Sequence, residues 1–174
     1  MSTVAPSTHA ATTATDTPAE ALCTPEDFHI EPRSDLGQRC LRILVARPAG
    51  AVLARFDGSL PVDHASYLTV QIGPGQHILL RPDFLECINH SCAPNVHFDM
   101  ERFALVALRP LAAGEELTYF YPSTEWSMVQ PFPCACGATE CLGTIAGASQ
   151  LPREVLGRYV FSPFIRRGLA ALEG

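Results

Sequence analysis

The pattern that most limits the possible folds is a series of short apolar segments separated by glycine and proline turns. Each segment is three to six residues long, which is short for a helix but typical of strands bounded by turn residues. The segment at 103–108 is apolar on both faces, as in a central strand that is covered on two sides. The sequence therefore predicts a mainly β fold with few short helices, with strands at 41–46, 51–56, 67–72, 76–80, 96–98, 103–108 and 116–121.

The two ends of the chain differ from this β region. Residues 1–22 are mostly Thr, Ala, Ser and Pro and cannot bury enough apolar surface to offset the entropy of ordering, so we expect a disordered tail. Near the other end, 152–160 begins with a proline that suits the first turn of a helix, and 164–172 can form another helix.

Composition excludes several classes of protein. The 174 residues suffice for one domain, and no apolar run approaches the roughly 18 residues of a membrane span. The N-terminus lacks the basic and apolar regions of a secretory signal, so we expect a cytoplasmic protein with no membrane partner. Five of the 18 acidic residues precede the first basic residue, Arg33, and the rest of the chain is nearly neutral. It lacks the basic footprint expected for direct nucleic-acid binding.

Three of the seven cysteines lie within eight residues, at Cys134, Cys136 and Cys141. An odd number of cysteines without an export signal argues against a disulfide framework. Pro133 and Gly137 flank the group and suit a chain that wraps around a metal; a loop of small buried cysteines is the alternative. Structural zinc takes four ligands in a tetrahedron and leaves no open position for catalysis. The residues alone leave the fourth ligand open among Cys23, Cys40, Cys87, Cys92, His90 and His97.

A polar segment, Asn89-His90-Ser91-Cys92-Ala93-Pro94-Asn95, directly follows an apolar stretch. One interpretation is a polar turn whose groups satisfy one another. A second is nucleophilic catalysis by Ser91 with His90, although adjacent residues rarely point at one another and no G-x-S-x-G elbow is present. A third is a thiol nucleophile at Cys92.

This segment is the first of three motifs in a fixed order. The second is Gly-Glu-Glu-Leu-Thr-Tyr-Phe-Tyr at 114–121, and the third is Cys-x-Cys-Gly-x3-Cys-x-Gly at 134–143. Together they resemble the SET-domain protein-lysine methyltransferases with their post-SET cysteine motif, over roughly residues 40–143. The resemblance implies a SET-domain fold of short β-sheets with a knot-like crossing and a C-terminal zinc-binding segment. It also implies methyl transfer from S-adenosylmethionine to a lysine side chain of a protein.

The resemblance divides the chain into regions. After the tail, it implies a SET-like domain at 33–125, a post-SET zinc segment at 126–145 and a C-terminal helical extension at 146–174.

Site residues are carried over from the family's motifs. The resemblance implies that Asn89 and His90 bind S-adenosylmethionine. Trp126 and Phe132 lie just beyond the motif at 114–121 and can cover it, with a role as ordinary core aromatics as the alternative. It also implies that Cys92 is the fourth ligand of a structural zinc, beside Cys134, Cys136 and Cys141.

The resemblance places the chemistry on two tyrosines. The knot-like crossing brings Tyr121, which matches the family's catalytic tyrosine, beside Asn89. Tyr119 occupies a position where the family carries Tyr or Phe, and Tyr there resembles the enzymes that stop at one methyl group.

The chain departs from the family pattern in three places. The family's Gly-x-Gly falls on Gln38 and Cys40, with Gly37 one place early, which suggests a shifted turn or weak cofactor binding. Phe120 stands where an Asp is common, and the segment between 56 and 89 is short. These departures leave two alternatives open: a SET-type enzyme acting on a small amine or amino acid, and a non-catalytic zinc-stapled binding module.

Overall fold

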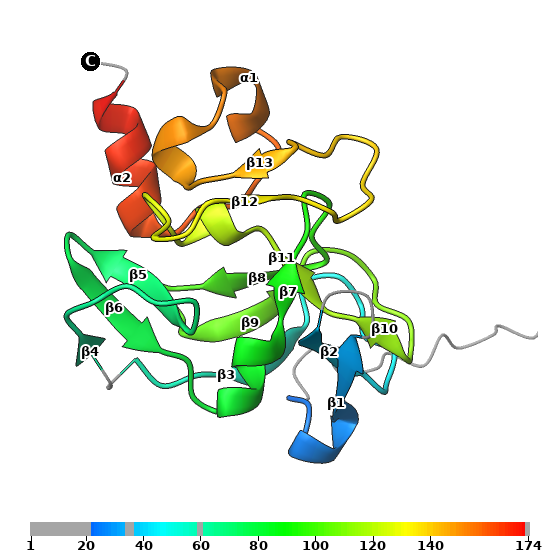
Figure 1. The fold of residues 1–174 in the computed structure, drawn as a ribbon. Coiled ribbons are helices and arrows are strands. Elements are labelled where there is room, and N and C mark those ends of the chain that lie inside the picture. Colours follow the sequence, from blue (N-terminus) through cyan, green and yellow to red (C-terminus); the bar gives the residue numbers. More distant parts are fainter. Residues whose placement is uncertain (1–21, 34–36, 59–60, 173–174) are drawn as a thin grey trace, which may run out of the picture.

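The computed structural model describes residues 22–33, 37–58 and 61–172, so the predicted tail lies outside the described part except for Leu22. Small sheets make up most of the regular secondary structure in this part, and the α-helices lie toward the C-terminal end (Figure 1). The mainly β prediction is confirmed. The sheets have the orders β1(Phe28–Arg33)-β2(Gln38–Ile43)-β10(Glu115–Glu116), β3(Val52–Arg55)-β9(Ala104–Ala107)-β8(Val96–Asp99), β4(Pro61–Val62)-β6(Gln76–Leu79)-β5(Thr69–Gly73), β11(Thr118–Tyr119)-β7(Asn89–His90) and β12(Phe132–Pro133)-β13(Thr144–Ile145).

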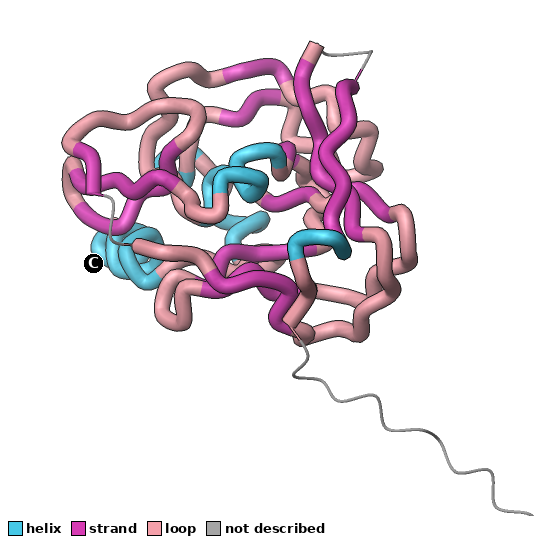
Figure 2. Tube along the Cα trace, turned by 90° about the horizontal axis from the view of Figure 1, so that it is seen from below, coloured by secondary structure: helices cyan, strands magenta, loops and turns pink. Residues whose placement is uncertain are grey.

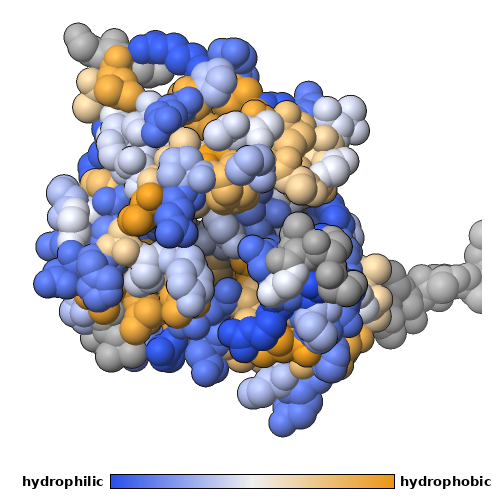
Figure 3. Space-filling view, viewed as in Figure 1, coloured by the Kyte–Doolittle hydropathy of each residue, from blue (hydrophilic) through white to orange (hydrophobic). Residues whose placement is uncertain are grey.

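The helices are short. The α-helices are α1 (Arg153–Leu156) and α2 (Pro163–Ala171), and the 3-10 helices are η1 (Pro25–Asp27), η2 (Asp83–Cys87), η3 (Tyr121–Ser123) and η4 (Ala148–Gln150). The hydroxyl of Ser162 caps α2 by accepting from Ile165 N–H, and Pro163 follows at the first helical position. No helix in the described residues is long and apolar enough to cross a membrane. On the face shown in Figure 3, hydrophobic and hydrophilic residues are interspersed.

Two expected strands have different bounds for local reasons. The strand predicted at 67–72 begins only at Thr69, because Ser66 and Thr69 form a hydrogen-bonded turn in which the Ser66 N–H donates to Thr69 Oγ1 at 2.9 Å. The strand predicted at 116–121 stops at Tyr119. Pro122 has no backbone N–H and a fixed φ, and it lies in η3.

The core has two parts. The larger cluster lies among the sheets, where β9 is the middle strand of its sheet and is buried along its whole length, as predicted for 103–108. The smaller cluster contains Phe120, Phe161 and Ile165 and lies under the C-terminal helices. The ring of Phe120 stacks on Tyr159 with 3.6 Å between centroids. Seen from below, α2 lies at one side of the strands (Figure 2).

Asn95 binds the segment that follows β7 to residues 115–118 through four hydrogen bonds. Its Oδ1 accepts from Thr118 N–H at 2.8 Å, and its Nδ2 donates to the carbonyl of Glu116 at 2.7 Å and to Glu115 Oε1 at 3.0 Å. Its own backbone N–H donates to the Thr118 carbonyl at 3.1 Å. The side chain is almost fully buried, so these bonds have no replacement from water.

We expect Asn95→Ala to lower the free energy of unfolding by about 2–4 kcal/mol, because it leaves buried donors and acceptors unpaired. Denaturant unfolding measures the change, and replacement of the exposed Gln150 by Ala is the control. A loss below about 1 kcal/mol would show that Asn95 does not hold these two segments together.

Candidate active site and cysteine cluster

Two segments far apart in sequence meet as parallel strands. In the β7–β11 pair, Asn89 lies opposite Thr118 and His90 lies opposite Tyr119. The Ser91 N–H continues the pairing by donating to the Tyr119 carbonyl at 3.0 Å. Figure 1 shows this pair between the lower sheets and the C-terminal elements. The structure thus brings together the residues predicted to bind the cofactor and those predicted to carry the chemistry.

Tyr119 and Tyr121 lie side by side. Their ring centroids are 4.7 Å apart, and the Phe98 ring packs edge-on against Tyr119 at 4.8 Å. The Tyr121 hydroxyl donates to the carbonyl of Ile88 at 3.3 Å. Two tyrosines are therefore fixed next to the strand that carries Asn89 and His90.

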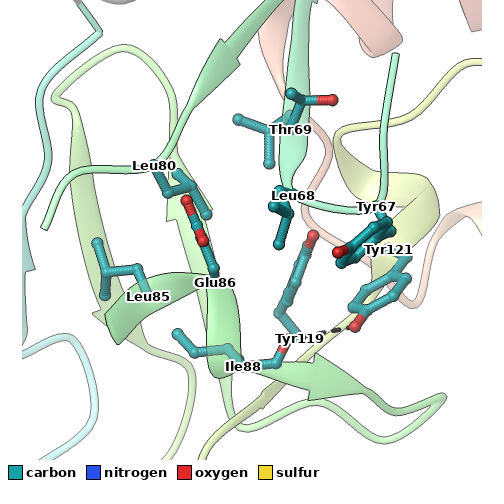
Figure 4. Close-up of a pocket in the computed structure, with 10 residues that line it drawn as sticks. Tyr67, Leu68, Thr69, Leu80, Leu85, Glu86, Ile88, Tyr119 and Tyr121 are labelled. Atoms are coloured by element: carbon teal, nitrogen blue, oxygen red, sulfur yellow. Dashed lines mark hydrogen bonds between the residues drawn. The ribbon is translucent and has the colours of Figure 1, made fainter. Parts of the chain in front are cut away.

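Both tyrosines line a small pocket that encloses about 10 Å³, with the rest of the hollow open to solvent. Figure 4 shows them on one side of the pocket, with the 3-10 helix η2 on the other. Most of the remaining wall is aliphatic, with one carboxylate in it. The lining residues are Tyr67, Leu68, Thr69, Val70, Leu80, Leu85, Glu86, Ile88, Tyr119 and Tyr121.

Burial keeps these tyrosines un-ionised. It raises the pKa of Tyr121 to about 12 and the pKa of Tyr119 well above its ordinary value. Both hydroxyls therefore carry a proton at physiological pH. They can accept a hydrogen bond from an amine or donate to it without adding a charge to the pocket.

His90 is held as a neutral ring between the tyrosines and the cysteines. Its Nδ1 accepts from Tyr121 N–H at 3.3 Å, and its Nε2 lies 3.4 Å from Cys92 Sγ. Burial lowers the pKa of its imidazole to about 4. The rings of Phe120 and Phe132 both lie 5.7 Å away, centroid to centroid.

Asn89 contacts the strand on which the expected glycines are missing. Its Nδ2 donates to the carbonyl of Arg39 at 2.8 Å and lies 3.5 Å from Glu116 Oε1. Arg39 is the middle residue of the Gln38-Arg39-Cys40 segment, and the Cys40 side chain is fully buried. The chain enters β2 through Gly37, which has a φ of +62°. The positive-φ glycine therefore stands one place before the family's first glycine.

The cysteine cluster consists of Cys92, Cys134, Cys136 and Cys141. All four sulfur atoms lie within 4.8 Å of one another, and those of Cys92 and Cys134 are 3.9 Å apart. Four sulfurs around a tetrahedral zinc with bonds of about 2.3 Å lie about 3.8 Å apart, so the geometry fits. Cys92 follows β7, whereas the others lie between β12 and β13. The group therefore joins the crossing segment to a distant loop.

The donor chemistry of the cluster also fits a metal. The Leu142 N–H donates to Cys92 Sγ at 3.4 Å, and the Gly143 N–H donates to Cys141 Sγ at 3.5 Å, contacts that a metal-bound sulfur can also accept. Although burial opposes it, hydrogen bonds from backbone groups and neighbouring thiols lower the pKa of Cys136 to about 6.

The two aromatic residues predicted to cover the cofactor take different places. Phe132 lies 6.1 Å from Tyr121, ring to ring, on the His90 side of the pocket. Trp126 belongs to the smaller core cluster. There its ring packs so closely on Gly168 of α2 that an added Cβ would come within 2.5 Å of it. A role for Trp126 in cofactor binding stays a prediction.

Sequence reasoning missed three residues at or behind the pocket, namely Tyr67, Glu86 and Glu125. Tyr67 was missed because the sequence placed it in the strand expected at 67–72, with no motif nearby to mark it. Glu86 lies three residues before Asn89, and this closeness to a motif was a signal that could have identified it. Glu125 carried no signal, because its burial depends on the long-range contact of its carboxylate with the Gln71 N–H at 3.0 Å.

Glu125 makes stability depend on pH. Burial raises the pKa of its carboxyl from 4.5 to about 8, so the folded protein holds this proton more tightly than the unfolded chain does. The free energy of unfolding should therefore fall, by up to a few kcal/mol, as pH rises from about 4.5 to about 8. We expect Glu125→Gln to remove this decline in denaturant titrations. Glu140→Gln, at a side chain that is 73% exposed, is the control, and an unchanged slope in Glu125→Gln would contradict the assignment.

Comparison with known proteins shows the family to which this chain belongs. A family model described as SET domain matches residues 23–122, and the chain belongs to this family. Methyltransferase flvH of Aspergillus flavus is 48% identical over 131 residues, which cover 74% of this chain and 73% of flvH. The protein is therefore a SET-domain methyltransferase of the S-adenosylmethionine-dependent class.

Other relatives match smaller parts. The Drosophila melanogaster histone-lysine N-methyltransferase ash1 is 38% identical over 69 residues, which cover 36% of this chain and 3% of ash1. A crystal structure of KRYPTONITE with mCHH DNA, an H3(1-15) peptide and SAH has a TM-score of 0.51 and 25% identity, and the match covers 67% of this chain and 29% of that chain. A second KRYPTONITE structure, with mCHG DNA and SAH, has a TM-score of 0.54 and 24% identity, covering 67% of this chain and 28% of that chain.

Proposed function

We propose that the protein transfers a methyl group from S-adenosylmethionine to an aliphatic amine, with the lysine side chain of a protein as the first candidate substrate. The observation that carries this proposal is the pair of un-ionised hydroxyls on Tyr119 and Tyr121 in a small pocket whose wall also includes five aliphatic side chains. An amine must lose its proton and align with the methyl donor before it can react. The apolar wall favours the neutral amine, and the hydroxyls orient it.

The cofactor would be held next to this pocket. When bound, S-adenosylmethionine supplies an electrophilic methyl group on a sulfonium. Among the described residues, the Asn89 side chain uses only its Nδ2 as a hydrogen-bond donor, so its Oδ1 stays available to an amino group. His90 presents a neutral ring, with Phe132 beside it. Weak C–H···O contacts from the tyrosine hydroxyl hold a methyl group without a formal charge.

The cysteine cluster would hold a structural zinc. Four thiolates complete its tetrahedron and leave no position for a substrate, so its role is to fix the loop between β12 and β13. That loop begins next to Phe132, and Cys92 is two residues from His90. Zinc in a post-SET segment at 126–145 would thus keep one wall of the cofactor site in place.

A second candidate is a small amine as the substrate. Glu86 gives the pocket an acidic group that a plain lysine channel does not need, and the segment between 56 and 89 offers little chain for a peptide groove. Matches to the histone-lysine enzymes cover about a third to a half of this chain, whereas the match to flvH covers 74% of it.

Titration calorimetry with S-adenosylmethionine tests the cofactor part of this proposal. We expect saturable, equimolar binding that weakens in Asn89→Ala, with zinc found by elemental mass spectrometry at one atom per chain. Zinc without cofactor binding would favour the non-catalytic zinc-stapled binding module, and absence of both would overturn the proposal.

A further inference from the structure

Glu86 is a charged residue in a pocket that otherwise suits an alkyl chain. Its side chain is 10% exposed and lines the same pocket as Tyr119 and Tyr121. Burying a carboxylate costs free energy unless the charge is paired. Arg81 supplies such a pair, and the methyl transfer described above gives the remaining acceptor sites of the carboxylate no task.

Arg81 fixes the Glu86 carboxylate without saturating it. Its Nη1 donates to Glu86 Oε1 at 2.6 Å and to the carbonyl of Leu80 at 2.7 Å. Within the described ranges this is the one hydrogen-bonded partner of the Glu86 side chain. A carboxylate has about four acceptor sites. Glu86 is therefore held in one orientation and can still accept hydrogen bonds from a further cation.

Tyr67 stands at the mouth of the pocket. Its side chain is 90% exposed, although it lines the pocket. Two hydrogen bonds hold the turn that carries it: the Leu68 N–H donates to Ser66 Oγ at 3.2 Å, and Thr69 Oγ1 donates to the Ser66 carbonyl at 3.0 Å. Figure 4 shows Tyr67 beside Tyr121, with Glu86 across the pocket. Tyrosine faces attract ammonium groups.

Between these polar groups the wall is aliphatic. Methylene groups can pack there without unmet hydrogen bonds. The wall is formed by Leu68, Val70, Leu80, Leu85 and Ile88. A molecule that matches all of these groups has a short alkyl chain with an amine at each end.

We propose that Glu86 and Tyr67 determine specificity for a compact amine that carries a second positive charge. The reacting amino group lies at Tyr119 and Tyr121, and the second ammonium lies at Glu86, with Tyr67 closing the mouth. This inference rests on the proposed amine methylation and selects its small-molecule form. A lysine of a peptide brings a single ammonium into the pocket and leaves Glu86 without a ligand.

Labelled S-adenosylmethionine and short linear diamines, each compared with the monoamine of equal length, test the inference. We expect the wild-type protein to prefer the diamine by about tenfold to 100-fold in kcat/KM, as for a charge-assisted hydrogen bond. Glu86→Gln should bring this ratio close to one, and Tyr67→Leu should reduce it about two- to fivefold. Glu154→Gln, at an exposed glutamate on α1, is the matched control and should keep the ratio.

Different outcomes would overturn the specificity inference and the proposed amine methylation. Methylation of both amines at equal rates, or a diamine preference that persists in a folded Glu86→Gln variant, would overturn the specificity inference and leave amine methylation standing. Preference for a lysine peptide over both amines would do the same. No methylation of any amine by a protein that binds the cofactor would overturn the proposed function itself. Glu86→Asp, which keeps the charge, should retain part of the preference if Glu86→Gln fails to fold.

Discussion

Replacing Tyr121 by Phe is expected to reduce kcat by at least about 100-fold while the affinity for S-adenosylmethionine stays unchanged. The hydroxyl of Tyr121 lies in the pocket and donates to the Ile88 carbonyl at 3.3 Å, so its position is fixed. Loss of one oxygen leaves the ring packing with Tyr119 and Phe132 intact. It removes the group that orients the amine. Single-turnover transfer from labelled cofactor measures the rate, and calorimetry measures the affinity.

Tyr159→Phe is the matched control for this change. Tyr159 also loses a hydroxyl that is bonded to a backbone carbonyl, that of Cys92 at 3.0 Å, but it does not line the pocket. We expect it to keep most of the activity. Equal rates in the wild-type protein and Tyr121→Phe would remove Tyr121 from the mechanism.

The second large effect is expected at the cysteine cluster. Cys134→Ser should eliminate stoichiometric zinc after dialysis and lower the free energy of unfolding by about 3–5 kcal/mol, because a metal that joins two distant segments stabilises only the folded state. Cofactor affinity should fall with it, since the same loop adjoins Phe132 and Cys92 adjoins His90. Elemental analysis, denaturant unfolding and calorimetry measure the three changes.

Cys23→Ser is the control for the cysteine prediction, because Cys23 lies outside the cluster and accepts a hydrogen bond from Arg47 Nε at 3.2 Å. It should keep full zinc content. If Cys134→Ser bound zinc as tightly as the wild-type protein, the cluster would not be the metal site.

The β architecture could be predicted from the sequence because it depends on local order. Apolar runs between Gly and Pro turns indicate strands, and the apolar faces of 103–108 indicate a central one, as β9 is. The short pairs β7, β11, β12 and β13 could not be predicted as separate strands, since two-residue strands have no periodicity and exist only through their partners.

In the site too, local patterns could be predicted from the sequence, whereas contacts between distant segments could not. Cys134, Cys136 and Cys141 form a local pattern, but the fourth cysteine comes from 42 residues away and could be chosen only by resemblance to a family. The meeting of Tyr121 and Asn89 likewise depends on a parallel pairing between distant segments. Glu86 and Glu125 acquire their environments from tertiary contacts, which local sequence does not show.

The central claim is that this pocket methylates an amine. Its most direct test is incubation of the wild-type protein and Tyr121→Phe with a cell extract and S-adenosylmethionine labelled in the methyl group, followed by separation of protein from small molecules and identification of the labelled atom. We predict label on an amine nitrogen in the wild-type reaction, in the small-molecule fraction if Glu86 acts as inferred, and none with Tyr121→Phe. Label on oxygen or sulfur, or equal label with both proteins, would contradict the account.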